Sequence, residues 1–168
     1  MIQIMLDQTG ECIEFGDISA EQAMAMHLMI DQALRIVWLG EAYLLAGRLS
    51  EAYTQAQRVL EFSRAHKERG HEAYALRLLG EVHARHDPPE VEAAETHYRQ
   101  ALTLAEELGM RPLQAHCHRG LGTLYAATGQ QEQAPAELAT AIAPYRAMDM
   151  AFWLPQVEAV LAQVEGQS

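Results

Sequence analysis

The sequence predicts an all-α protein, an α-solenoid of three helix pairs and a C-terminal capping helix, preceded by a short N-terminal β-hairpin. Two observations predict this fold class. The 168 residues are rich in Ala, Leu, Glu and Gln, which favour helices, and their 6 Pro and 11 Gly are too few for an all-β protein with many turns. A Leu-Gly pair ends at Gly40, Gly80 and Gly122, and such a recurrence indicates a stack of similar units.

The start of the chain does not share the repeat pattern. Residues 1–18 are expected to form the β-hairpin, because apolar stretches flank the turn-forming sequence Asp7-Gln8-Thr9-Gly10. The repeat domain is expected over 19–168. Its first helix should run unbroken over 19–46, since Ser19 and Gln22 fit a capping box at its start.

The remaining helices follow from apolar periodicity and from the Gly and Pro breaks between segments. They are expected at 49–68, 71–86, 90–108, 112–128, 131–147 and 152–165. Taken in pairs, they define repeats of about 31–68, 71–109 and 112–149. The helix at 152–165 is left without a partner, and we expect it to cap the last apolar face of the array.

Each repeat places a Gly inside its first helix, where Gly costs about 0.5–1 kcal/mol relative to Ala. This cost is tolerable where a second helix approaches closely. The second helix of each repeat carries a small residue at matching positions, and we expect these to face the Gly: Ala52, Ala94 and Ala134. In the middle repeat the matching residues of the second helix lie two residues further from the Gly than in the other two repeats. The two extra residues fall at Pro88-Pro89, where a loop is expected.

These spacings resemble the tetratricopeptide repeat (TPR) family, which alternates a large apolar residue, Leu-Gly, an aromatic residue and then Ala. The matching positions are Ile36, Leu39-Gly40, Tyr43 and Ala52; Leu76, Leu79-Gly80, His83, Ala94 and Tyr98; and Leu121-Gly122, Tyr125, Ala134 and Leu138. The first large position lacks the family's Trp, and the period exceeds the common value of about 34 residues.

The stretch from about Trp38 to Val164 also resembles the C-terminal repeat arrays of large bacterial regulators, which carry nucleotide-cyclase or ATPase modules upstream. Residues 87–95 and 107–113 carry this resemblance. It implies a regulatory or sensory interaction module with a role in signalling.

Composition excludes several classes of partner and location. With 12 basic and 23 acidic residues the net charge is −11, which argues against nucleic acid and against an anionic membrane surface. No apolar run is long enough to span a membrane, and the first residues lack the basic start of a signal peptide. Two Cys do not make a disulfide scaffold, so we expect a reduced, cytoplasmic protein.

Motifs that would indicate an enzyme, a cofactor or a metal are also missing from the sequence, so none of the three is expected. His83 and His86 are three residues apart and could share a helix face, but two imidazoles without a third ligand make a weak metal site. The consecutive His116-Cys117-His118 cannot converge, because successive helical residues point about 100° apart. Cys117 is expected to be a small buried residue.

The TPR resemblance implies a concave groove, lined by the first helix of each pair, that holds a protein or peptide. Counted from the Gly, the groove positions are Val37, Glu41 and Leu45; Tyr74, Arg77, Glu81 and Arg85; and His116, Arg119 and Thr123. Arg77 and Arg119 share one repeat position. The alternative is a solvated face on which Arg77 and Glu81 form an i,i+4 pair worth about 0.2–0.5 kcal/mol.

The residue types at the groove positions indicate the charge of a suitable partner. Family members that clamp a C-terminal carboxylate use Lys and Asn at these positions, whereas this chain has no Asn and its one Lys, Lys67, lies in a turn. A groove with both Arg and Glu suits a ligand of mixed charge.

Three functions compete on these grounds. The leading hypothesis is a non-catalytic scaffold that binds a protein or peptide. The second is a homodimerisation module built on the N-terminal hairpin and the long first helix. The part of that helix ahead of its repeat is apolar on nearly all sides, so we expect it to be buried, with Met24, Leu28 and Met29 as contact residues. The third is a metal or small-ligand sensor that uses the His residues.

Overall fold

The computed structural model describes residues 32–130 and 132–166, and these form seven α-helices. The helices are α2 (Gln32–Leu45), α3 (Leu49–His66), α4 (Arg69–Ala84), α5 (Val91–Glu107), α6 (Arg111–Ala127), α7 (Ala134–Ala147) and α8 (Leu154–Glu165). The end of α2 and both ends of every later helix lie within a few residues of the predicted bounds, and the described residues contain no strand. The predicted hairpin, the helix before residue 32 and the predicted self-association residues lie outside the described residues.

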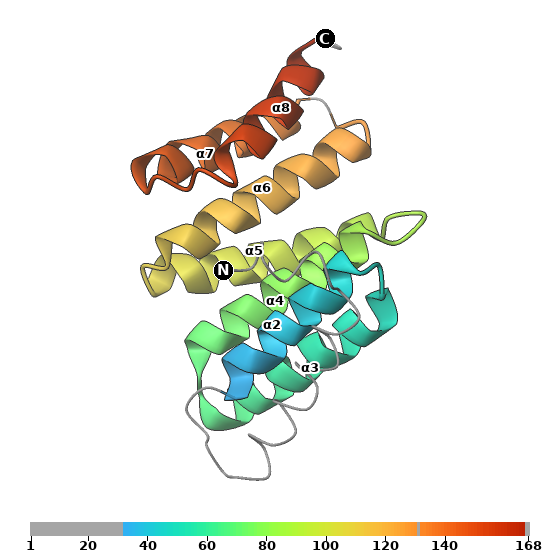
Figure 1. The fold of residues 1–168 in the computed structure, drawn as a ribbon, viewed down its shortest axis with the longest axis vertical. Helices are drawn as coiled ribbons and strands as arrows, with labels where there is room; N and C mark the ends of the chain where they lie inside the picture. The colour runs from blue at the N-terminus through green and yellow to red at the C-terminus, as the bar shows by residue number, and fades with distance from the viewer. Residues whose placement is uncertain (1–31, 131, 167–168) are drawn as a thin grey trace.

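Successive helices pack as the pairs α2–α3, α4–α5 and α6–α7, and α8 packs against α7 and α6 (Figure 1). The predicted array of helix pairs is therefore confirmed for the described residues. Short turns close the first and third pairs at Gly47 and Gly129, whose φ angles of 74° and 76° suit a residue without a Cβ. None of the described helices is long and apolar enough to cross a membrane.

The repeat Gly residues lie where two helices touch, as expected. A Cβ added at Gly80 would come 2.8 Å from Cδ1 of Tyr98, and one at Gly122 would come 2.6 Å from Cγ of Leu138. The atoms nearest these added Cβ atoms thus belong to Tyr98 and Leu138, each one helical turn after the predicted Ala94 or Ala134. Both Ala residues are buried in the same core cluster as Tyr98 and Leu138.

The core consists of two clusters of buried side chains. One joins α2, α3 and α4 with parts of α5 and α6, and the other joins α5, α6, α7 and α8. The first helices of successive pairs also contact one another directly, α2 with α4, α4 with α6 and α6 with α8. These four helices therefore line one continuous side of the stack, which we call the first-helix face.

Candidate functional site

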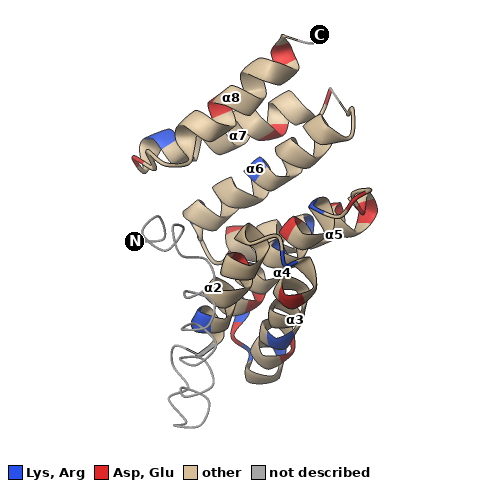
Figure 2. Cartoon of the chain, turned by 45° about the vertical axis from the view of Figure 1, so that its right-hand side comes forward, with Lys and Arg blue, Asp and Glu red and all other residues tan. Residues whose placement is uncertain are grey.

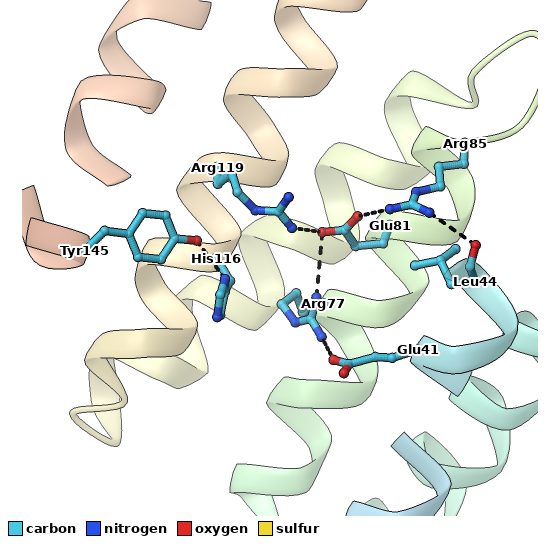
Figure 3. Close-up of polar contacts among 8 residues, drawn as sticks. All are labelled: Glu41, Leu44, Arg77, Glu81, Arg85, His116, Arg119 and Tyr145. Carbon is cyan, nitrogen blue, oxygen red and sulfur yellow. Dashed lines mark hydrogen bonds and ion pairs between the residues drawn. The ribbon is translucent and has the colours of Figure 1, made fainter. Parts of the chain in front are cut away.

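The first-helix face carries a chain of ion pairs that connects three repeats (Figure 3). Arg77 on α4 pairs through Nη2 with Glu41 on α2. Arg119 on α6 donates from Nη2 to Oε1 of Glu81 on α4 at 2.6 Å. Each Arg stands three residues before its repeat Gly, and each Glu one residue after the Gly of the preceding repeat. The recurrence of these residue types is therefore matched by a recurring contact between neighbouring repeats.

Glu81 is the centre of this network. Besides Arg119, its carboxylate lies 3.6 Å from Nη1 of Arg77 and 3.7 Å from Nη2 of Arg85. Arg85 also donates from Nη1 to the carbonyl oxygen of Leu44, at 3.2 Å, near the end of α2. The predicted i,i+4 pair of Arg77 and Glu81 is present, but the shorter contacts of both residues are to other helices.

Burial separates the inner members of the network from the outer ones. The side chains of Arg77 and Glu81 are 8% and 9% exposed, whereas those of Arg119 and Arg85 are 18% and 43% exposed. Burial alone would raise the pKa of Glu81, but Arg119, Arg77 and Arg85 outweigh it and hold that pKa below its ordinary value. Burial opposes the charge of Arg77 too, yet Glu41 and Glu81 raise its pKa. Both groups are therefore ionised at neutral pH.

The network has more positive charge than its carboxylates neutralise. Its three guanidinium groups face two carboxylates, those of Glu41 and Glu81. The Nε atoms of Arg77 and Arg119 are buried and have no hydrogen-bond partner among the described residues. Such buried donors ordinarily find a partner, which makes these two unusual.

Three rings, those of His116, Tyr145 and Trp153, lie beside the network where α6 meets the start of α8. A hydrogen bond of 2.6 Å joins the Tyr145 hydroxyl to Nδ1 of His116. The His116 ring stands edge-on to Trp153 with centroids 5.0 Å apart, and the Arg119 guanidinium lies 4.8 Å from the centroid of the same indole. Burial, and then the charges of Arg77 and Arg119, lower the pKa of His116 to about 3, so this imidazole is neutral.

The other predicted groove residues differ in how accessible they are. Leu45 and Thr123 are exposed, and Tyr74 is half-buried against the core. Val37 is buried in the core and does not present its side chain on the surface. Tyr145 and Trp153 were absent from the predicted groove, because they lie on α7 and just before α8 rather than at first-helix positions.

The two imidazoles considered as a weak metal site, those of His83 and His86, both form a hydrogen bond with the carboxylate of Glu90. Nδ1 of His83 lies 2.5 Å from Oε2 of Glu90, and Nδ1 of His86 lies 3.0 Å from Oε1 of the same residue. His97 stacks on His83 with centroids 5.1 Å apart. In the part of the chain that the structure describes, no three His, Cys, Asp or Glu residues are arranged to hold a metal ion.

The three residues His116-Cys117-His118 point to different surroundings, as the sequence predicts. His118 bonds through Nδ1 to Glu137 on α7 at 2.6 Å, whereas His116 faces Tyr145. Cys117 is a buried core residue, and burial raises the pKa of its thiol to about 12.

Comparison with known proteins supports the fold. No protein-family model matches the chain, and no curated protein sequence matches it. Among solved structures it is similar to the crystal structure of aspartyl phosphate phosphatase F from Bacillus subtilis, with a TM-score of 0.80 and 19% sequence identity. The match covers 96% of this chain and 43% of that chain, so this chain spans less than half the length of that protein. At this identity the likeness concerns the fold alone: the described helices pack in sequential pairs, like those of a TPR solenoid.

Proposed function

We propose that this chain is a non-catalytic module that binds a protein or peptide along its first-helix face. The observation that carries the proposal is the continuity of this face over α2, α4, α6 and the start of α8. It exposes apolar and polar side chains of successive repeats, among them Leu45, Arg85 and Thr123. An extended ligand suits such a surface, since stacked repeats offer it successive subsites.

The chemistry of the face supports binding rather than catalysis. The Glu81 carboxylate is held ionised by neighbouring guanidinium groups, and the pKa of His116 lies far below neutral pH. The buried thiol of Cys117 has a pKa near 12, which disfavours the thiolate that a nucleophile requires. The proposal includes a regulatory or sensory role for this module when it binds its partner. It does not include the phosphatase activity in the name of the similar structure.

A peptide selection on the full chain tests the proposal. Random octapeptides displayed on phage are selected for binding to the full chain. The affinities of the enriched peptides are then measured by fluorescence anisotropy. Thr123→Trp adds bulk to the middle of the first-helix face and should weaken binding at least tenfold. Thr103→Trp is the matched control, because Thr103 is an exposed Thr on the second helix α5, and this variant should bind as the wild type does.

Two results would contradict the proposal. One is a selection in which no peptide is enriched above the level seen with an unrelated protein. The other is a set of enriched peptides whose binding Thr103→Trp weakens and Thr123→Trp leaves unchanged, which would place binding on the second helices.

A further inference from the structure

The charge of the ion-pair network is opposite in sign to that of the whole protein. The chain carries a net charge of −11. In the network, Arg77, Arg85 and Arg119 exceed Glu41 and Glu81 by one positive charge. The excess lies toward α6, which contains Arg111 and Arg119 but no acidic residue (Figure 2). One further carboxylate would bring the network to neutrality.

Two of the three guanidinium groups can reach a ligand. Arg85 and Arg119 approach the Glu81 carboxylate from different helices and contact different oxygens, Oε2 and Oε1 (Figure 3). Arg85 is the more accessible, with 43% of its side chain exposed, and its contact to Glu81 at 3.7 Å is long. Behind them Arg77 is more than nine-tenths buried and keeps an Nε–H without a described partner. The network therefore contains guanidinium N–H donors that no described residue satisfies.

An apolar surface lies directly beside Arg119. The Trp153 ring lies under the Arg119 guanidinium, and Phe152 stands edge-on to Trp153 with centroids 4.9 Å apart. Phe152 is 51% exposed, which leaves a large aromatic surface open next to a positive charge. Arg119 thus touches both the carboxylate of Glu81 and the ring of Trp153, on which Phe152 packs.

We propose, on the basis of the function proposed above, that the ligand is a peptide whose Asp or Glu side chain accepts hydrogen bonds from Arg85 and Arg119 beside Glu81, while a neighbouring apolar side chain packs on Phe152 and Trp153. The rest of such a peptide is neutral or basic, because the acidic remainder of the protein repels further negative charge. Charge-assisted hydrogen bonds from two guanidinium groups supply the affinity for the carboxylate. The aromatic pair selects the neighbouring residue.

The experiment uses the octapeptides selected on the full chain. We expect Asp or Glu next to a large apolar residue to be enriched among them. Replacing that acid with its amide in the tightest peptide should weaken binding to the wild type at least tenfold. On Arg85→Gln the same replacement should change affinity less than threefold, because the more exposed of the two cations that bind the acid is gone. Arg85→Lys, which keeps the charge, should restore part of the difference.

Matched controls separate recognition from folding. Arg64→Gln removes an exposed Arg of the second helix α3 and should leave the tenfold amide effect intact. Phe152→Ala should weaken the peptide severalfold, while Leu108→Ala, which removes another exposed apolar side chain, should not. Circular dichroism verifies that each variant is folded at the assay temperature.

Failure of this inference is distinguishable from failure of the proposed function. Peptides that bind, and that Thr123→Trp weakens, but that show no acidic preference would overturn the carboxylate site and leave peptide binding in place. An amide effect that stays tenfold on Arg85→Gln would also overturn it. A selection that enriches no peptide would overturn both.

Discussion

Arg77 and Glu81 carry opposite charges at positions where most residues of a repeat protein are apolar. The pair is not by itself a stabilising device, because desolvating two ions can cost as much as their attraction returns. Removing one partner is a different matter, since the remaining charge is then buried without compensation. The ion-pair network therefore has a buried part, Arg77 and Glu81, that connects neighbouring repeats, and a more exposed part that includes Arg85.

Arg77→Ala is expected to destabilise the protein by about 3–5 kcal/mol, because it removes one cation from the buried Glu81 and the partner of Glu41. The matched control is Arg64→Ala, whose exposed pair with Glu72 at 2.9 Å should be worth about 1 kcal/mol or less. Urea denaturation of both variants measures the difference. Equal losses would show that the network does not join the repeats energetically.

His116 makes stability depend on pH in a defined direction. Its folded-state pKa of about 3 lies below the value of 6.5 for an unfolded chain, so the unfolded state takes up the proton first as pH falls. The contribution to stability is complete above pH 6.5 and is lost progressively as pH falls toward 3. Between pH 7 and pH 5 this loss amounts to about 2 kcal/mol.

His116→Gln should remove that part of the pH dependence, because an amide does not titrate in this range and can still bond to Tyr145. The free energy of unfolding, measured in urea at pH 7 and pH 5, should fall by about 2 kcal/mol less in the variant than in the wild type. If both proteins lose the same amount, His116 titrates normally in the folded state.

At the scale of the helices, α5 supplies the contact that sets how closely neighbouring helices pack. Tyr98 lies against Gly80 of α4 and Gly120 of α6, and a Cβ at Gly120 would come 2.5 Å from the ring. One ring is therefore enclosed between two first helices. Glycine at both positions is explained by this close approach, since helix propensity alone would favour Ala.

Gly80→Ala is expected to destabilise the protein by about 1–3 kcal/mol, because the added methyl overpacks against the Tyr98 ring. Gly70→Ala lies on the same helix, where the added Cβ would meet only Sδ of Met110 at 4.0 Å. This control should be neutral or more stable by up to about 1 kcal/mol. Thermal melting of the two variants compares them, and a Gly80→Ala protein that melts with the wild type would contradict the packing described here.

The sequence predicts the positions of the helices but not the contacts between them. The register of the repeats and the start and end of each helix are local properties, so periodicity and turn residues predict them. The contact of Tyr98 with two glycines is not local, because it depends on how far one helix is rotated against its neighbour. The same holds for Trp153, which reaches Arg119 only because α8 packs against α6.

At the scale of the whole molecule, the array is held together by contacts between neighbours along the chain, as expected for a solenoid. Whether two copies associate is a property of the full chain. The residues predicted for self-association lie outside the described residues, so the homodimer stays a prediction. Its reason is the apolar composition of the segment around Leu28.

Sedimentation equilibrium of the full chain should give twice the 18.7 kDa of one chain. Replacing Leu28 and Met29 together with Glu should yield a monomer, because the interface would then bring like charges together. A double substitution on an exposed second-helix site, Thr103→Glu with Glu106→Gln, changes the surface charge pattern elsewhere and should leave the dimer intact. A wild-type protein that stays at one chain mass at high micromolar concentration would contradict the prediction.

The sequence by itself determined the helical class, the three repeats, the bounds of their helices, and the residue types that recur on the first helices. It could do so because each of these depends on composition, periodicity or a turn within one short segment. Only the tertiary structure decided that Arg77 and Arg119 reach back to Glu41 and Glu81, that Val37 is buried, and that Trp153 packs against Arg119. These contacts depend on the offset and rotation of stacked helices, which residue spacing along one helix does not specify.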